Sequence, residues 1–305
     1  MTARGFLELT ADEPAGDPTA KIRAIRLLLV AHLVTETALS VIRSSGLGIP
    51  LGPQVTMLVA SVGALACAFV PGLARVAAPL GAAIVGIAVV RYVPNVANHT
   101  FLLFLALAAL ALFPGRSTDE RTLALSTLRW LAAIVLFATG VQKLMHGTYF
   151  HGEFLAFQIA SGERFAALFR WVLPGEEFER LRALGAMHDS GAGVLPVPLP
   201  RGSGPFRFES FAGLLVSNSV YLFEMIAPVL LVIRRTRTVA AVATVLFLAA
   251  VELGAREIMF GILFVNLVLL FLRGNWTGRL LPIFLAAYAY LIAVNLGLLP
   301  QWIFQ

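Results

Sequence analysis

The sequence predicts an all-α protein, a polytopic bundle of about nine transmembrane helices. Its residues are 59% apolar and only 13% charged, whereas soluble globular domains average about 45–50% and about 25%. Several apolar stretches approach the ~20 residues that a helix needs to cross a bilayer core of ~30 Å. These stretches are continuous and do not alternate with polar residues, which favours helices over the strands of a membrane barrel.

The predicted spans form two groups, separated by a long polar segment. They cover residues 22–42, 53–71, 74–93, 98–114, 122–145, 211–233, 237–254, 256–272 and 279–298. The first twenty residues contain four carboxylates and lack a basic start followed by an apolar stretch, so they do not form a cleavable signal. We therefore expect a flexible cytoplasmic tail at 1–20 and a membrane domain at 21–305.

Basic residues predict the orientation of the chain. If nine spans alternate in direction, eleven basic residues in the loops or at the adjoining ends of the spans fall on one side: Lys21, Arg23, Arg26, Arg75, Arg116, Arg121, Arg234, Arg235, Arg237, Arg273 and Arg279. Cytoplasmic loops carry such an excess, so the N-terminus should be cytoplasmic and the C-terminus exterior. The net charge of +6 is spread over these loops and forms no basic face, which argues against a nucleic-acid partner. The expected partner of the chain is membrane lipid.

The long polar segment, residues 147–210, should then be an exterior loop. It begins with aromatic residues, continues through a charged amphipathic piece at Glu176–Arg182, and ends in the Gly/Pro-rich stretch Gly191–Pro205. The composition of this last part cannot bury a core, so we expect it to be mobile or dependent on a partner.

Lys143 is the most informative residue. The chain has only two lysines, and Lys143 lies where the fifth predicted span meets aromatic and ionisable residues. A lone lysine in such a position is a candidate for amine chemistry. The alternative is an interfacial anchor, with the ammonium group extended into the lipid headgroups.

Other polar residues reach the same predicted membrane face. Three sets, far apart in sequence, lie at the outer ends of the fourth, fifth and seventh spans: Asn95, Asn98 and His99; Gln142, Lys143 and His146; Glu252, Arg256 and Glu257. They predict an exterior-facing cavity with Lys143 and His99 as catalytic residues and Asn95, Asn98, Gln142, His146 and Glu252 as binding residues. Simpler alternatives are a helix-start hydrogen bond for His99 and a one-turn ion pair between Glu252 and Arg256.

Two carboxylates lie deeper in the predicted spans. Glu36 follows His32 by one turn, and Glu224 precedes Pro228 by four residues. A carboxylate at membrane depth should be protonated or paired, and the His32–Glu36 set is typical of interhelical hydrogen bonding. The cluster His146, His151 and Glu153 matches no compact zinc pattern, so no metal site is predicted.

The segment Gly140-Val-Gln-Lys-Leu144, followed by Tyr149-Phe-His-Gly-Glu-Phe-Leu155, resembles the vitamin K-dependent γ-carboxylase family and its bacterial relatives, the horizontally transferred transmembrane domain (HTTM) proteins. Asn98-His99 is similar to an Asn-His pair of that family. Glu224–Pro228 and Met259–Asn266 resemble later segments less specifically, and the resemblance covers about residues 22–275. It implies that Lys143 is a base and that His99, oriented by Asn98, acts near a quinone oxygen.

The resemblance implies an integral enzyme of the bacterial plasma membrane, a lyase or oxidoreductase. Reduced naphthoquinone of the vitamin K type, O2 and CO2 would be its co-substrates, and an exterior peptide or small molecule would be carboxylated, without a metal. The sequence has no counterpart of the family's large lumenal domain, and its single cysteine, Cys67, cannot form the family's disulfide. Two alternatives remain: a non-catalytic factor that matures or exports a peptide, acting with that peptide or a separate exterior subunit, and a DoxX-like quinone-binding redox subunit.

Overall fold

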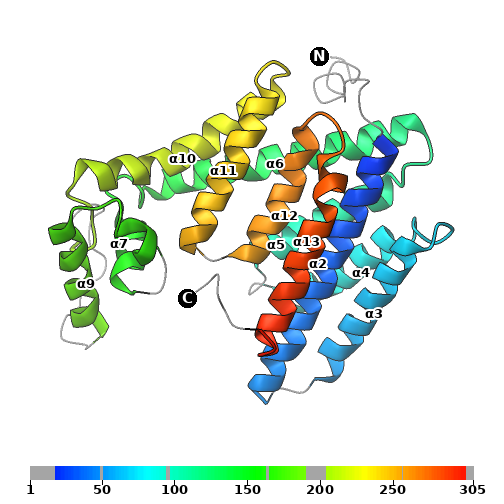
Figure 1. Ribbon diagram of the computed structural model, residues 1–305, viewed down its shortest axis with the longest axis horizontal. Helices are drawn as coiled ribbons and strands as arrows, with labels where there is room; N and C mark the ends of the chain where they lie inside the picture. The colour runs from blue at the N-terminus through cyan, green and yellow to red at the C-terminus, as the bar shows by residue number, and fades with distance from the viewer. Residues whose placement is uncertain are drawn as a thin grey trace. The chain divides into compact units, whose positions relative to one another are not determined.

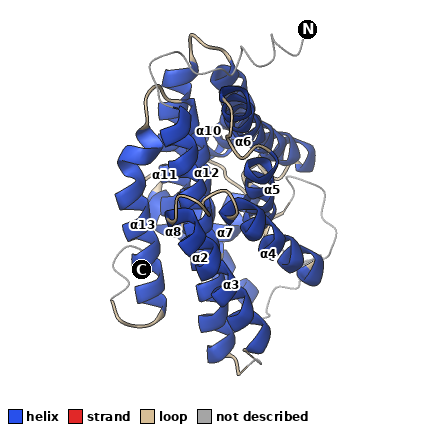
Figure 2. Cartoon of the chain, turned by 90° about the vertical axis from the view of Figure 1, so that its right-hand side faces the viewer, coloured by secondary structure: helices blue, strands red, loops and turns tan. Residues whose placement is uncertain are grey.

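The structure is a computed structural model that describes residues 18–48, 51–93, 97–162, 165–189, 204–255 and 257–299. Over these ranges the chain forms helices and no strands (Figure 2), which confirms the prediction of an all-helical protein. The chain divides into two compact units. Unit 1 comprises Met1–Ala132 and Ile258–Gln305, and unit 2 comprises Ala133–Glu257, so that the boundary falls within one helix, α6.

A helix coincides with each of the nine predicted spans. These helices are α2 (Pro18–Gly46), α3 (Gly52–Phe69), α4 (Ala77–Tyr92), α5 (Asn98–Leu112), α6 (Thr118–His146), α10 (Phe211–Val232), α11 (Arg237–Ala255), α12 (Ile258–Val268) with the 3-10 turn η1 (Leu269–Phe271), and α13 (Trp276–Asn295). In the described part of the chain, six of them, α2, α3, α6, α10, α11 and α13, are long and apolar enough to cross a membrane. Six such helices are typical of an integral membrane protein. The other three are shorter apolar helices, and a count of nine spans stays a prediction.

The helix α2 is the centre of unit 1. It packs against α3, α4, α5, α12 and α13, and Figure 1 shows α13, in red, beside α2, in blue. It begins at Pro18, so the last three residues of the predicted tail are helical, while residues 1–17 lie outside the described part. Lys21 in its first turn is only 1% exposed and donates a hydrogen bond to the carbonyl of Leu272 (3.1 Å).

Buried basic side chains bind carbonyl groups near helix C-termini. Arg129 of α6 is 1% exposed and donates from Nε (2.8 Å) and Nη2 (2.6 Å) to the carbonyl of Leu270 in η1. Arg26 donates to the carbonyl of Pro114, just beyond α5 (3.0 Å), and Arg237 donates to carbonyls at the end of α10. The last carbonyls of a helix have no donor within the helix, and a cation there also interacts favourably with the helix dipole. Lys21, Arg26 and Arg237, which help to predict the orientation, thus also donate hydrogen bonds to carbonyl groups at or just beyond helix C-termini.

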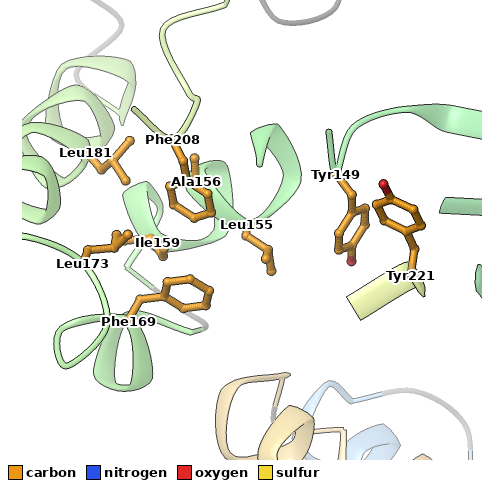
Figure 3. Close-up of a cluster of buried hydrophobic side chains, with 9 residues drawn as sticks. All are labelled: Tyr149, Leu155, Ala156, Ile159, Phe169, Leu173, Leu181, Phe208 and Tyr221. Carbon is orange, nitrogen blue, oxygen red and sulfur yellow. The ribbon is translucent and has the colours of Figure 1, made fainter. Parts of the chain in front are cut away.

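Most of the predicted exterior loop is folded. Its described residues, 147–189 and 204–210, form a helical insert with α7 (Glu153–Ala160), α8 (Ala166–Phe169) and α9 (Gly175–Asp189). Apolar side chains gather around α7 (Figure 3): Leu155, Ala156, Ile159, Phe169, Leu173, Leu181 and Phe208, together with Tyr149 and with Tyr221 of α10. The insert therefore has its own small core. Most of the Gly/Pro-rich stretch, residues 191–203, lies outside the described part.

Hydrogen bonds and close contacts tie the insert to the spans that follow it. Glu177 of α9, 8% exposed, accepts from the backbone N–H groups of Glu209 (2.5 Å) and Ser210 (3.2 Å), at the start of α10. Phe165 has a left-handed backbone, with φ of 61°, and its N–H donates to the carbonyl of Gly254 at the end of α11 (3.0 Å). Its ring occupies the space where a side chain at position 254 would lie, which explains the glycine there.

Candidate functional site

The first candidate site lies where α6 crosses α10 in unit 2. Gly140, one turn before Lys143, allows this crossing to be close, because a Cβ at position 140 would lie 2.8 Å from Cγ of Met225 and 3.0 Å from Cβ of Glu224. The close approach places Lys143 Nζ against Glu224 Oε1, and the two form a hydrogen-bonded ion pair. The lysine side chain is 25% exposed and the glutamate side chain 8%. Lys143 is therefore joined to a buried carboxylate on another helix.

An aromatic ring lies on the other side of Lys143. Its Nζ is 5.5 Å from the centre of the Tyr149 ring, within the range of a cation–π interaction. Tyr149 is held in place because its carbonyl accepts a hydrogen bond from Ser217 of α10 (2.7 Å). Burial raises the pKa of the Tyr149 hydroxyl, and the carboxylates of Glu224 and Glu257 raise it further, so Tyr149 is a neutral phenol. Lys143 Nζ thus lies between a carboxylate and an aromatic ring face, both of which interact favourably with a cation.

The second candidate site lies in unit 1, between α2 and α5. Oε1 of Glu36 accepts a hydrogen bond from the Thr100 hydroxyl (2.6 Å) and lies 3.6 Å from Nε2 of His99. Oε2 of Glu36 is buried, and among the described residues no group donates to it. One oxygen of this carboxylate is thus hydrogen bonded within the protein, and the other is buried without a donor among the described residues.

These residues line a pocket of about 330 Å³, a size at the lower end of the usual range for small-molecule sites. Its wall combines apolar side chains (Leu33, Met57, Val85 and Ala88) with polar ones (Glu36, Thr37, Ser40, Arg43, Gln54, His99 and Thr100). Oε1 of Gln54 is a second buried acceptor that no described group approaches as a donor. The lining therefore suits a molecule with an apolar body and polar groups that can form hydrogen bonds.

A further hydrogen bond lies deeper in unit 1. Nδ1 of His32 lies 3.0 Å from the hydroxyl of Tyr288 on α13, and His32 is fully buried. The ring centres of His32 and His99 are 6.2 Å apart, and the rings are nearly perpendicular. His32 and Glu36 thus each contact another helix, as the interhelical interpretation predicts, and His32 lies close to the ring of His99.

The remaining predicted site residues are less enclosed. Asn98 is the exposed first residue of α5, and Gln142 and His146 are exposed on the last turns of α6. Glu252 of α11 is partly buried, with Oε2 lacking a donor among the described residues. Asn95 and Arg256 lie outside the described residues, so the predicted Glu252–Arg256 ion pair lies there too.

The predicted residues are divided between the two units. Asn98 and His99 belong to unit 1, whereas Lys143, Gln142, His146 and Glu252 belong to unit 2. The structure brings His99 to Glu36, and Lys143 to Glu224 and Tyr149. It adds Gln54, for which the sequence carried no signal. The sequence marked Glu224 as a carboxylate at membrane depth that needs a partner. Gly140, one turn before Lys143, allows the close helix crossing that supplies this partner.

Comparison with known proteins identifies no relative. No protein-family model matches the chain, and no curated protein and no solved structure matches it significantly. The two sites themselves therefore carry what can be inferred about function.

Proposed function

We propose that this protein is an integral membrane enzyme that uses a reduced naphthoquinone and oxygen, in the manner of the vitamin K-dependent γ-carboxylases and HTTM proteins that its motifs resemble. The observation that carries the proposal is the unit 1 pocket, in which His99 and Glu36 lie together on a partly apolar wall. Glu36 and Gln54 also line this pocket, and each has one buried side-chain oxygen that lacks a donor among the described residues.

A reduced naphthoquinone has the complementary chemistry. It carries two hydroxyl donors on an apolar double ring, whereas the oxidised quinone has acceptors only. Burying Glu36 Oε2 and Gln54 Oε1 without donors costs about 1–3 kcal/mol each. A rotation of either side chain toward a quinol hydroxyl would recover this free energy, so the pocket should prefer the quinol over the quinone. His99, beside the Glu36 carboxylate, would hold a quinol oxygen in place and exchange a proton with it.

The protein's own residues would bind the quinol, orient it, remove a proton from it and keep water out. The resemblance implies that Lys143 is the base, and within unit 2 Lys143 is hydrogen bonded to Glu224. When oxidised by O2, the bound quinol supplies a base strong enough to remove a proton from carbon, so that CO2 can add to an exterior peptide or small substrate. One oxygen atom of O2 ends in the quinone epoxide and the other in water. Exclusion of bulk water matters because water would consume such a base.

The same proposal includes nine spans in a bacterial plasma membrane, with the N-terminus cytoplasmic and the C-terminus exterior. Its support is the coincidence of nine apolar helices with the predicted spans, together with the basic residues of alternate loops. The insert would then be exterior, on the side where an exported substrate is found.

The test is epoxide formation by purified protein supplied with reduced vitamin K and oxygen. We expect turnover by the wild type and a loss of at least about 100-fold in Lys143→Ala and in His99→Ala, the usual range for removing an acid–base group. His151→Ala is the matched control, because His151 is exposed on the insert and should leave turnover unchanged. Absence of epoxide with well-folded wild type, or full turnover by Lys143→Ala, would contradict the proposal.

A peptide-maturation factor is the second candidate, and the folded insert favours it. A compact helical element with its own core, and with Trp171 89% exposed, offers a surface for an exported peptide or an exterior subunit. In that case Lys143→Ala would be harmless, while Trp171→Ala would weaken binding of the peptide. A DoxX-like redox subunit would instead reduce or oxidise quinone only when an electron-transfer partner is present.

A further inference from the structure

Only one group of the Lys143–Glu224 pair can accept a proton in the resting state. A lysine can act as a base only as a neutral amine, because an ammonium group has no lone pair to accept a proton. Here Nζ is hydrogen bonded to a carboxylate and lies 5.5 Å from the centre of the Tyr149 ring. Both neighbours stabilise the ammonium form. The group of the pair that retains free lone pairs is therefore the carboxylate.

We infer that Glu224 is the terminal proton acceptor of this site, and that Lys143 is the cation that keeps Glu224 ionised and passes a proton to it. The inference rests on the proposed function, because it names which group of that enzyme receives the proton of its substrate. It changes the role of Lys143 from base to proton carrier.

The geometry gives each residue a part in the transfer. The lysine side chain is 25% exposed and the glutamate side chain 8%, so Nζ is the outer group of the pair and the carboxylate the inner one. One N–H proton of Nζ moves along the existing hydrogen bond to Oε1 of Glu224, and the lone pair that this leaves on Nζ accepts the proton of the substrate. Lys143 is an ammonium group before and after the transfer, Glu224 becomes a carboxylic acid, and the substrate leaves as its conjugate base.

The backbone beside the carboxylate is also interrupted. Pro228 has no N–H group, so the backbone carbonyl of Glu224 loses its usual donor four residues later in α10. The pair thus lies at a local interruption of the backbone hydrogen bonding of α10.

The first experiment reads the state of the carboxyl group by infrared spectroscopy of the purified full-length protein. In Lys143→Met the cation is removed, and a carboxylate at membrane depth without a cation becomes protonated. We expect the carbonyl stretch of a carboxylic acid to appear in Lys143→Met and to be absent in Lys143→Met/Glu224→Gln. Lys143→Arg keeps a cation and should not show the band. A band from Glu224 already present in the resting wild type, or none in Lys143→Met, would overturn the inference.

The second experiment remains informative if Lys143→Met does not fold. The chain has two lysines, and Lys21 is buried with its Nζ hydrogen bonded to Leu272. An amine-specific reagent applied to the folded protein should therefore modify Lys143 as the principal side-chain amine, with Lys143→Arg as the blank. Glu224→Gln removes the counter-ion, so a larger fraction of Lys143 should be the neutral, reactive amine, and modification should be about tenfold faster or more. An unchanged rate would contradict the inference.

Turnover then separates the inference from the proposed function. With Glu224 as terminal acceptor, Glu224→Gln should lose quinol turnover although Lys143 is present, and Glu224→Asp should recover part of it. Turnover retained in Glu224→Gln would return the role of base to Lys143 and overturn the inference while leaving the proposed function intact. If the wild type shows no quinol turnover at all, the proposed function fails, and the infrared and labelling results still decide the state of the pair.

Discussion

Gly140 shows how a single residue positions the site. A Cβ at this position would lie 3.0 Å from both the Glu224 Cβ and the backbone nitrogen of Met225, so any larger residue must push α10 away from α6. The Lys143–Glu224 hydrogen bond depends on that short separation. Gly63 of α3 offers a matched control, because a Cβ there would meet no atom within 4 Å.

We expect Gly140→Leu to destabilise the protein, whereas Gly63→Leu should be neutral or slightly stabilising. Both substitutions bring the same gain in helix propensity, up to about 1 kcal/mol, but only the first overpacks a helix crossing, at a cost of about 1–3 kcal/mol. Denaturation of the purified protein in detergent, followed by circular dichroism, measures the difference. Equal stability of the two variants would mean that α6 and α10 are not tightly packed at Gly140.

At the scale of the element, Glu177 links α9 to the start of α10. Its Oε1 accepts from two backbone N–H groups that have no partner within α10. A carboxylate at a helix N-terminus also interacts favourably with the helix dipole. Glu177 therefore couples the folding of the insert to the first turn of a predicted membrane span.

Glu177→Ala should loosen that first turn. Loss of a charge-assisted acceptor costs about 1.5–3 kcal/mol, so amide hydrogen exchange over Phe211–Leu214 should accelerate about tenfold or more. Glu179→Ala is the control, since Glu179 is exposed on the same helix. Exchange that is equally slow in both variants would show that the first turn of α10 is stable without the contact to α9.

The helices were more predictable than the sites, for a physical reason. Membrane helices follow from continuous apolar runs, and each of the nine predicted spans coincides with a helix. Lys143 and His99 could be singled out because isolated ionisable groups in such runs are costly. Their partners, Glu224 and Glu36, lie 81 and 63 positions away, and one sequence does not contain the pairing of residues so far apart. The helices of the insert were not predicted, because its small core joins α7 to Phe169, Leu181 and Phe208. Contacts between such separate segments leave no single hydrophobic periodicity in the sequence.

At the scale of the whole molecule, the predicted orientation can be tested with cysteines. Cys67 is the only native cysteine, so Cys67→Ser gives a cysteine-free background. In that background, Glu176→Cys on the insert should react with a membrane-impermeant thiol reagent in intact cells. Asp119→Cys, exposed at the start of α6, should react only after the membrane is permeabilised. The reverse pattern would place the N-terminus outside.

The discontinuity of unit 1 has a consequence for the synthesis of the chain. Its central helix, α2, leaves the ribosome first, yet α12 and α13 follow only after all of unit 2 has been made. Lys21 finds its acceptor at Leu272, and His32 finds its hydrogen-bond partner at Tyr288. Until then, Lys21 and His32 lack these partners, and burying a polar side chain in lipid without a hydrogen-bond partner costs free energy. The nascent α2 must therefore be kept near water or shielded by the insertion machinery, and the last helices to be inserted complete the first.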